Sequence, residues 1–388
     1  MKIASARVLV LRIPLQRPFS HNLAVRHRSE SVVVQLTADT GETGFGEGAP
    51  RAYVTGETAA SCVAHIERVF LPAIFREECC SLGAQAAPAD VLAAIDALLP
   101  ARGSGGVLAF HAAKCAVELA WLDLALKHAG QPFGVLLPPC GGTPVYSAVI
   151  GADDVETARA TAAECVRLGL RVFKVKVGQG DDYGRVAAVR ELAGEGASLR
   201  VDANGAFDEA GTLELLRRLA PLRIESIEQP VQRGDLRALA RVRAASAVPV
   251  MVDESLVTER DAAALIAGHA CDSFNLRLSK NGGVQQTRQL AAMARAAGLG
   301  VQVGCQVGET AILAAAGLHL AAHLPGVKYL EGAYGRRLLQ ADVSRAPVEF
   351  GPGGLAPGLS GPGLGVEVCA DALQRYAVRT LDVPNRAA

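Results

Sequence analysis

The sequence predicts an α/β protein built on a parallel, eight-stranded β/α barrel with a smaller α+β domain before it. Asp202, Glu228 and Asp253 lie 26 and 25 residues apart, each at the end of an apolar, strand-like run. Lys176 lies 26 residues before Asp202, and Arg277 lies 24 residues after Asp253. A strand–helix–strand unit of a β/α barrel takes about 30 residues, so this spacing is typical of successive barrel strands. Barrel enzymes place their chemistry at the carboxyl ends of those strands.

The first 130 residues lack this regular alternation and are predicted to form the α+β domain (1–130). Residues 1–55 have the alternation and the glycine-rich turns of antiparallel strands. The residues after them favour helices, and the longest helix is predicted from Phe110 to His128. Gly130 and a proline two residues later end it, because neither residue continues a helix well.

Short strands alternate with helical segments of 10–15 residues in the predicted barrel domain (145–345). Eight strands at this spacing favour a closed barrel over an open doubly wound sheet. Thr258 with Asp261 indicates a capping box at the start of one helix. The tail (346–388) is rich in glycine and proline at first and is predicted to return to the N-terminal domain. The predicted strands are 146–150, 171–176, 198–202, 224–228, 249–253, 272–277, 299–304 and 327–331.

The overall charge excludes several classes of partner. The chain has 388 residues, enough for about two domains, with 39 basic and 39 acidic side chains. The protein therefore has no excess positive charge that would attract nucleic acid or an anionic membrane. We expect instead a small carboxylate substrate that is held by local charges. No stretch approaches about 18 uncharged apolar residues, so no membrane span is predicted.

The cysteines and the N-terminus indicate a cytoplasmic location. The chain has nine cysteines without a Cys-x-x-Cys pair, and Cys79 and Cys80 are adjacent, which is a poor framework for disulfides. Arginines interrupt the first apolar stretch, so it does not read as a signal peptide. We therefore expect reduced thiols in a cytoplasmic protein.

Three carboxylates at strand ends predict a divalent-metal site. Asp202, Glu228 and Asp253 are hard oxygen ligands that suit Mg²⁺, with Mn²⁺ as an alternative. Each residue alone could instead be a helix N-cap, but three in register make that explanation weak. Asn204 shares its face with Asp202 and can orient a ligand. Glu254 faces away from Asp253, so we expect it to support the site by contacting a residue that itself touches the metal or substrate, or through an ion pair.

Two lysines on one strand predict the general base. Lys174 and Lys176 are two residues apart and so point to the same side, which for a barrel strand is the interior. Their mutual repulsion and a nearby metal should lower the pKa of one of them. The alternative is a pair of exposed lysines on an edge strand.

The order of these motifs resembles the enolase superfamily, specifically its muconate-lactonizing-enzyme subgroup. The motifs are Lys-Val-Lys, Asp-Ala-Asn-Gly, Glu-Gln-Pro, Asp-Glu-Ser and Lys-Asn-Gly-Gly. The resemblance spans nearly the whole chain and implies a (β/α)7β modified TIM barrel, a capping domain that the C-terminal tail completes, and a homo-oligomer. It also implies that a mobile loop starting at Arg17 covers the substrate, that Gly46 and Glu47 close a hairpin, and that Glu331 is an acidic site residue on the eighth strand.

The resemblance also implies roles for the site residues. The three carboxylates would bind Mg²⁺, Lys176 would be the acid/base, and Lys174 would tune it. The chemistry is removal or return of a proton α to a carboxylate through an enediolate, whose charge a metal stabilises. Other residues are expected to contact the substrate: His21, Tyr53, Gln306 and Glu331.

Arg277 departs from the subgroup pattern, which has a second catalytic lysine at this position. Arginine is effectively always protonated and is a poor base. One base favours cycloisomerisation of a muconate-like diacid, or syn elimination of water, over epimerisation. A dehydratase or epimerase acting on an amino-acid derivative or hydroxy acid remains an alternative, as does a ligand-binding member without turnover. Lys280 is expected in the turn that follows, and whether Arg277 replaces the second catalytic lysine or Lys280 substitutes for it stays open.

Overall fold

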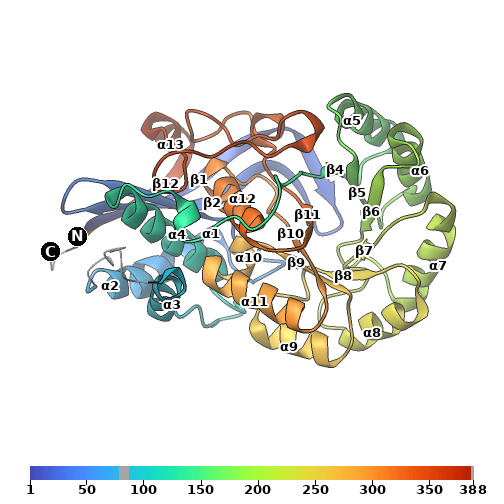
Figure 1. The fold of residues 1–388 in the computed structure, drawn as a ribbon, viewed down its shortest axis with the longest axis horizontal. Helices are drawn as coiled ribbons and strands as arrows, with labels where there is room; N and C mark the ends of the chain where they lie inside the picture. Colours follow the sequence, from blue (N-terminus) through green and yellow to red (C-terminus); the bar gives the residue numbers. More distant parts are fainter. Residues whose placement is uncertain (78–86, 386–388) are drawn as a thin grey trace.

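The computed structural model describes residues 1–77 and 87–385, and Figure 1 shows the chain as a ribbon. Cys79 and Cys80 lie outside the described residues. Every cysteine within them is free. No helix of the described ranges is long and apolar enough to cross a membrane.

Four antiparallel strands form the sheet of the capping domain, in the order β12-β1-β2-β3. Gly44, Gly46 and Gly48 of β3 let helix α4 pack directly on the sheet: a Cβ at Gly46 would lie 2.1 Å from the Ala116 carbonyl oxygen. The C-terminal tail supplies β12, which pairs with β1, as predicted. The strand bounds are β1 Ile3–His21, β2 Ala24–Ala38, β3 Thr43–Gly48 and β12 Ala377–Pro384.

Helix α4 (His111–His128) lies between this sheet and the barrel, and the structure confirms the predicted helix almost to the residue. Every side chain from 111 to 126 is buried, because α4 packs on β3 on one side and on α10 on another. Many of these residues are alanines, which allow close approach of neighbouring backbones. The other capping-domain helices are α1 Ala59–His65, a π-helical turn Ile66–Phe70, α2 Leu71–Ile74, α3 Pro88–Leu98 and a 3-10 turn Phe133–Val135.

Eight parallel strands form the barrel, with each strand next to its sequence neighbour. A bridge between Tyr146 and Leu330 joins the two ends of the sheet, and the Ser147 N–H donates to the Leu330 carbonyl at 2.8 Å. This contact closes the barrel beside β4 and β11. The strands are β4 Ala148–Ile150, β5 Val172–Lys176, β6 Ser198–Asp202, β7 Ile227–Glu228, β8 Val250–Val252, β9 Ser273–Leu276, β10 Gly300–Val303 and β11 Val327–Leu330.

Each of the first seven barrel strands is followed by an α-helix, whereas β11 is followed only by a 3-10 turn, Gly335–Arg337, before the tail (Figure 1). The structure thus confirms the predicted (β/α)7β barrel with its α+β cap. Thr258 and Asp261 form the predicted capping box at the start of α9. The helices are α5 Val155–Arg167, α6 Asp182–Ala193, α7 Glu209–Leu219, α8 Leu236–Ala245, α9 Glu259–Ala267, α10 Leu278–Asn281, α11 Val284–Ala296, α12 Ala311–His323 and α13 Ala370–Tyr376 in the tail.

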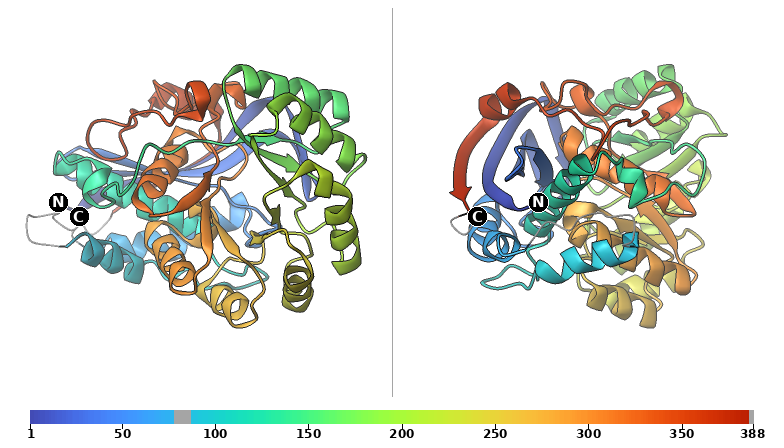
Figure 2. Two further views of the ribbon diagram at one scale, coloured as in Figure 1. Left: turned by 45° about the vertical axis from the view of Figure 1, so that its right-hand side comes forward. Right: turned by 60° about the vertical axis from the view of Figure 1, so that its left-hand side comes forward.

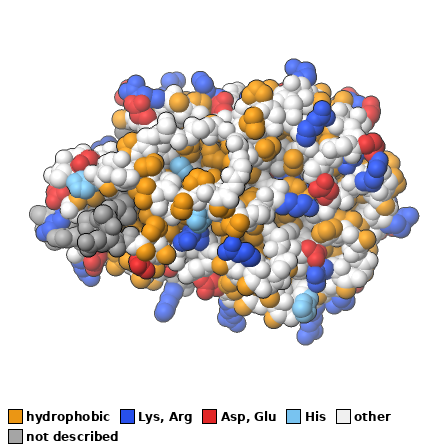
Figure 3. Space-filling view, in the orientation of Figure 1, with side chains coloured by type: hydrophobic (Ala, Val, Ile, Leu, Met, Phe, Trp, Pro, Cys, Tyr) orange, Lys and Arg blue, Asp and Glu red, His pale blue; other side chains and the backbone are white. Residues whose placement is uncertain are grey.

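The hairpin of β1 and β2 reaches from the capping sheet over the barrel strands (Figure 2). Asn22 at its tip donates through Nδ2 to the carbonyls of Val177 at 2.9 Å and Ala203 at 2.5 Å, just beyond the ends of β5 and β6. The tip is thus fixed where the barrel side chains converge. On the face shown in Figure 3, basic and acidic side chains are interspersed, in keeping with the balanced composition.

Candidate active site

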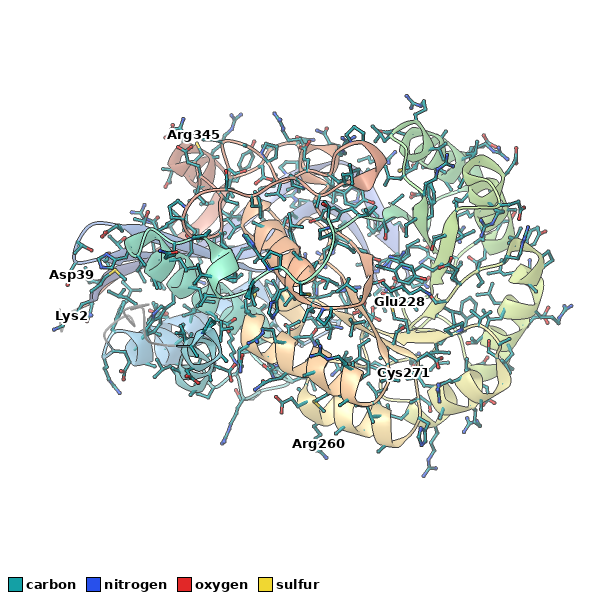
Figure 4. The ribbon with its side chains drawn as sticks, viewed as in Figure 1. Lys2, Asp39, Glu228, Arg260, Cys271 and Arg345 are labelled. Atoms are coloured by element: carbon teal, nitrogen blue, oxygen red, sulfur yellow. The ribbon has the colours of Figure 1, made fainter. Side chains whose placement is uncertain are left out.

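The three predicted metal-binding carboxylates lie at the ends of neighbouring strands. Asp202 ends β6, Glu228 ends β7 and Asp253 follows β8, and none is more than 1% exposed. Asp202 and Glu228 are paired in the strand register. Figure 4 shows Glu228 inside the ring of barrel strands, whereas Arg260 and Arg345 lie at the periphery. The barrel therefore places three buried carboxylates at the ends of adjacent strands.

Both lysines of β5 point into the same interior. Lys176 donates through Nζ to Asp202 Oδ2 at 2.5 Å. Lys174 Nζ lies 2.7 Å from Glu331 Oε1 and 3.2 Å from Asp202 Oδ2. The alternative of two lysines exposed on an edge strand is therefore wrong.

Asn204 and Glu254 hold Lys176 in place. Lys176 Nζ also donates to Asn204 Oδ1 at 2.8 Å, and Asn204 Nδ2 donates to Glu254 Oε1 at 3.0 Å. Asn204 has a φ of 43°, a left-handed conformation that is uncommon for a residue other than glycine. Glu254 therefore acts on Lys176 through Asn204 and not through an ion pair of its own.

Carboxylates around Lys174 determine its protonation state. Burial alone would lower its pKa, but the charges of Glu228, Glu331 and Asp202 outweigh burial and raise the pKa of Lys174 above its ordinary value. The predicted lowering of the pKa of one of the two lysines therefore does not fall on Lys174. This side chain is a fixed positive charge beneath the site.

Negative charge is crowded around Glu228. Burial, followed by the charge of Asp202, raises the pKa of Glu228 to about 7, although Lys174 opposes the shift. Glu331 and Asp253 add further repulsion. Glu228 Oε1 accepts a hydrogen bond from Asn275 Nδ2 at 2.8 Å. A cation placed among these carboxylates would relieve the repulsion.

Arg277 and Lys280 both bind Asp253, but from different sides. Arg277 Nη2 contacts Asp253 Oδ2 and lies 3.5 Å from Glu228 Oε1. Lys280 Nζ donates to Asp253 Oδ1 at 2.9 Å and to the Asn275 carbonyl at 2.7 Å. Lys280 is on the short helix α10, wholly buried, and not in a turn as expected. Only Arg277 of these two lines the cavity described below.

The carboxylate oxygens of the site are suitable ligands for Mg²⁺, but in this structure they are not arranged around a single ion. Among the residues that the structure describes, no three Asp, Glu, His or Cys side chains are close enough together to hold a metal ion. In this arrangement Lys174 and Lys176 contact the Asp202 carboxylate, and Arg277 contacts the Asp253 carboxylate. Buried carboxylates are nevertheless the ligands that Mg²⁺ prefers. Arg277 would have to leave Asp253 for three carboxylates to share one ion.

A cavity of about 130 Å³ opens beside these charges. Lys174, Lys176, Arg277, Gln306 and Glu331 line it. The resemblance implied that the segment starting at Arg17 covers the substrate, and residues 17–19 do form part of the wall.

Two of the predicted substrate contacts do not line this cavity. His21 and Tyr53 pack against each other with ring centroids 5.6 Å apart. Burial and the charge of Lys176 lower the pKa of His21 to about 3, so its ring is neutral. We therefore interpret His21 as packing beside the site.

Further site residues escaped the sequence analysis. Arg200 donates through Nη2 to Glu331 Oε1 at 2.5 Å and is completely buried. It lies two residues before Asp202 on β6, so strand alternation could have placed it on the same face. Gln302 Nε2 lies 3.3 Å from Glu331 Oε1. Gln229 Oε1 accepts the Asp253 N–H at 3.1 Å, a contact between strand ends with no sequence signal.

Comparison with known proteins decides the family. Residues 157–372 match the family model described as enolase C-terminal domain-like. This chain belongs to the enolase superfamily. The match covers more than half of the chain, and the relatives place it in the muconate-lactonizing-enzyme-like subgroup.

Three relatives match this enolase superfamily member over nearly its whole length. It is 30% identical to the N-succinyl-L-Arg/Lys racemase of Bacillus cereus over 97% of this chain and 98% of the relative. It is 29% identical to the chloromuconate cycloisomerase of Pseudomonas putida over 97% and 99% of the two chains. A crystal structure of a dipeptide epimerase from Cytophaga hutchinsonii, complexed with Mg and D-Ala-L-Val, superimposes with a TM-score of 0.86 and 27% identity, covering 99% and 100% of the chains.

Proposed function

We propose that this protein removes or returns a proton α to the carboxylate of a small organic acid, with Mg²⁺ as cofactor and Lys176 as the acid/base. The observation that carries the proposal is that Lys176 lines the cavity next to three buried carboxylates at adjacent strand ends. Asp202, Glu228 and Asp253 would hold Mg²⁺. When bound, the ion stabilises the negative charge that develops on the substrate carboxylate.

The residues around Lys176 define its task. Asn204 and Asp202 fix the direction of its Nζ, which keeps the reacting groups in one geometry. Lys174 cannot share the proton transfer easily, because the carboxylates around it favour its charged form. It supplies a constant positive charge among the carboxylates of the site.

Arg277 lines the cavity where a second base would be needed for a two-sided reaction. Burial disfavours its charge, but Asp253 and Glu228 outweigh burial and raise the pKa of Arg277 above its ordinary value. It can therefore hold an anion but cannot accept a proton. This supports a one-base reaction: cycloisomerisation of a muconate-like diacid or syn elimination from a hydroxy acid.

A second candidate is racemisation or epimerisation of an amino-acid derivative. The relative from Bacillus cereus favours it, because that protein is an N-succinyl-L-Arg/Lys racemase and matches almost the full chain. For this reaction Arg277 would act only as an anion holder, and another donor would have to return the proton on the far face. The remaining alternative is a member that binds an acid without turnover.

A substrate screen in D₂O separates the candidates. Diacids, N-acylamino acids, dipeptides and hydroxy acids are incubated with enzyme and Mg²⁺, with and without a chelator, and deuterium at the α-carbon is followed by NMR. A one-base enzyme exchanges a single enantiomer, and a racemase exchanges both. Loss of all exchange in the chelator is expected in either case. Binding without exchange of any acid would contradict the proposed enzyme and support the ligand-binding alternative.

A further inference from the structure

The barrel interior just below the site is polar, although the interior of such barrels is usually filled by branched aliphatic side chains. Side chains alternate along a strand, so the residue two before Asp202 points into the barrel as Asp202 does. Four strands each place a polar or charged side chain at this lower level, and none of the four is more than 2% exposed. They form what we call the polar layer: Lys174 of β5, Arg200 of β6, Asn275 of β9 and Gln302 of β10.

The polar layer directs its N–H groups at two carboxylates, those of Glu228 and Glu331. Asn275 Nδ2 donates to Glu228 Oε1 at 2.8 Å. Gln302 Nε2 lies 3.5 Å from Glu228 Oε2 and 3.3 Å from Glu331 Oε1. Lys174 Nζ lies 3.3 Å from Glu228 Oε2 and 2.7 Å from Glu331 Oε1. The position of Lys174 therefore depends on how strongly each carboxylate attracts it.

Arg200 is the second cation on Glu331. Its Nη2 donates to Glu331 Oε1 at 2.5 Å, and its Nη1 donates to Ser147 Oγ at 3.2 Å. The contact crosses the barrel, because β6 and β11 are not neighbours in the sheet. Since two cations share the charge of Glu331, Lys174 can also stay 3.2 Å from Asp202 Oδ2. Without the charge of Arg200, Glu331 would draw Lys174 away from Asp202.

Arg200 is itself held from the far end of the barrel. Its guanidinium carbon lies 4.3 Å from the centroid of the Tyr329 ring, a cation–π contact. The Tyr329 hydroxyl donates to Glu225 Oε2 at 2.7 Å, and Ser198 Oγ donates to the same oxygen at 2.7 Å. Ser198 begins β6 and Glu225 lies just before β7, so this anchor is at the amino ends of the strands. Arg200, Tyr329 and Glu225 do not line the cavity and thus act only through other residues.

We propose that Arg200 is a positioning residue for the reaction. Held by Tyr329 from the far end of the barrel, it shares the charge of Glu331 and so keeps Lys174 in contact with Asp202. The inference rests on the proposed function for the reaction that Lys174 assists. The position of Lys174 can nevertheless be measured without turnover, so the two can fail separately.

Crystal structures of the wild type and of Arg200→Gln, grown under the same conditions, measure that position. Glutamine keeps a hydrogen-bond donor toward Glu331 but removes the positive charge. Lys174 Nζ is expected to leave Asp202 and to pair with Glu331 alone. In Arg200→Lys, which keeps a charge, Lys174 should remain between the two carboxylates. An unmoved Lys174 in Arg200→Gln would overturn the inference whether or not the enzyme turns over.

Kinetics test the same role with the acid that the D₂O screen identifies. Arg200→Gln should lower kcat by about 10–100-fold, the usual effect of losing a residue that orients the groups of a metal site. KM should stay as in the wild type, because a fixed charge helps most where negative charge develops in the transition state. Arg200→Lys should recover part of kcat. Arg260→Met is the control, because Arg260 is exposed on α9 at the periphery (Figure 4).

The outcomes separate positioning from a purely structural role. Wild-type kcat in Arg200→Gln, or an equal loss in Arg200→Lys together with a raised KM, would overturn the inference. If Arg200→Gln does not fold, Tyr329→Phe decides, because it removes only the hydroxyl that anchors the ring. Its kcat should then fall by up to about tenfold at unchanged KM, and wild-type kcat would overturn the inference. A wild type that exchanges no acid would remove the proposed reaction and leave the crystallographic result standing.

Discussion

Lys176 is the residue on which the chemistry depends. Its Nζ donates hydrogen bonds to Asp202 and Asn204 inside the barrel, and Lys176 is only 6% exposed. Methionine has nearly the same length and no charge, so Lys176→Met removes the base without opening a large cavity.

We predict that Lys176→Met slows α-proton exchange by about 10²–10⁴-fold, the usual contribution of a positioned acid or base. Exchange rates in D₂O measured by NMR give this ratio. Lys328→Met is the matched control, because Lys328 is exposed and remote from the cavity. A Lys176→Met variant with wild-type exchange would remove Lys176 from the mechanism.

Arg277 controls access to Asp253. Because its guanidinium contacts Asp253 Oδ2, an incoming Mg²⁺ must break a charge-assisted hydrogen bond of about 1.5–3 kcal/mol. A lysine at this position lacks the planar fork of arginine and can lose its proton. The substitution therefore changes both metal binding and the number of available bases.

We predict that Arg277→Lys binds Mg²⁺ about tenfold more tightly, since each tenfold corresponds to about 1.4 kcal/mol. It should also gain exchange of the second enantiomer. Calorimetry and chiral NMR measure the two effects, with the exposed Arg237→Lys as control. Unchanged metal affinity would mean that Arg277 does not compete for Asp253.

The site residues whose positions could be predicted from the sequence are those that the alternation and spacing of strands determine. Asp202, Glu228 and Lys176 follow from the ends of apolar runs at regular steps. The contact of Arg277 with Asp253 could not be predicted, because the end of a long side chain depends on its rotamers and on neighbours distant in sequence. Lys280 was misplaced because no pattern distinguishes a four-residue helix from a turn.

At the scale of elements, buried carboxylates join the capping domain to the barrel helices. Glu118 of α4 accepts the Val284 N–H at 2.5 Å at the start of α11. Glu47 of β3 accepts the Thr310 and Leu313 N–H groups at the start of α12. The first N–H groups of a helix have no partner within the helix, so a carboxylate there satisfies them.

The Glu118 contact predicts a pH dependence of stability. Burial raises the pKa of Glu118 to about 7 from its ordinary value of 4.5, and the charge of Lys114 only partly offsets the shift. A raised folded-state pKa gives stability that is present below about 4.5 and lost as the pH rises through about 7.

In Glu118→Gln this loss should disappear, so its free energy of unfolding should fall less between pH 5 and pH 8 than that of the wild type. The difference is expected to be on the order of 3 kcal/mol. Urea titrations at both pH values measure it, with Glu77→Gln as the exposed control. Parallel pH dependence in wild type and Glu118→Gln would contradict the role of this carboxylate.

The sequence predicted the presence of each barrel strand, but it predicted strand lengths less well. All eight barrel strands occur where apolar runs end in turn residues, but β7 has only two paired residues against the five predicted. Gln229 has a φ of 38° and Pro230 follows it, so the chain leaves the sheet immediately after Glu228. Such local backbone geometry depends on hydrogen bonds that a single sequence does not reveal.

At the scale of the whole molecule, the repeated strand–helix unit identified the barrel, and the missing eighth helix shaped the cavity. The regular steps between charged residues predicted the barrel, and the resemblance implied the (β/α)7β form. How residues 333–350 fill the place of the eighth helix could not be read from the sequence, because that segment has no periodic pattern. The limits of the three segments, the homo-oligomer and the cytoplasmic location stay predictions.

Crystals of the protein soaked in Mn²⁺, which can replace Mg²⁺ and scatters anomalously, test the central claim most directly. The account predicts one anomalous peak bound jointly by Asp202, Glu228 and Asp253, with the Arg277 guanidinium displaced from Asp253. A peak at some other place, or a saturated crystal in which Arg277 still holds Asp253 and no ion lies among the three carboxylates, would contradict it.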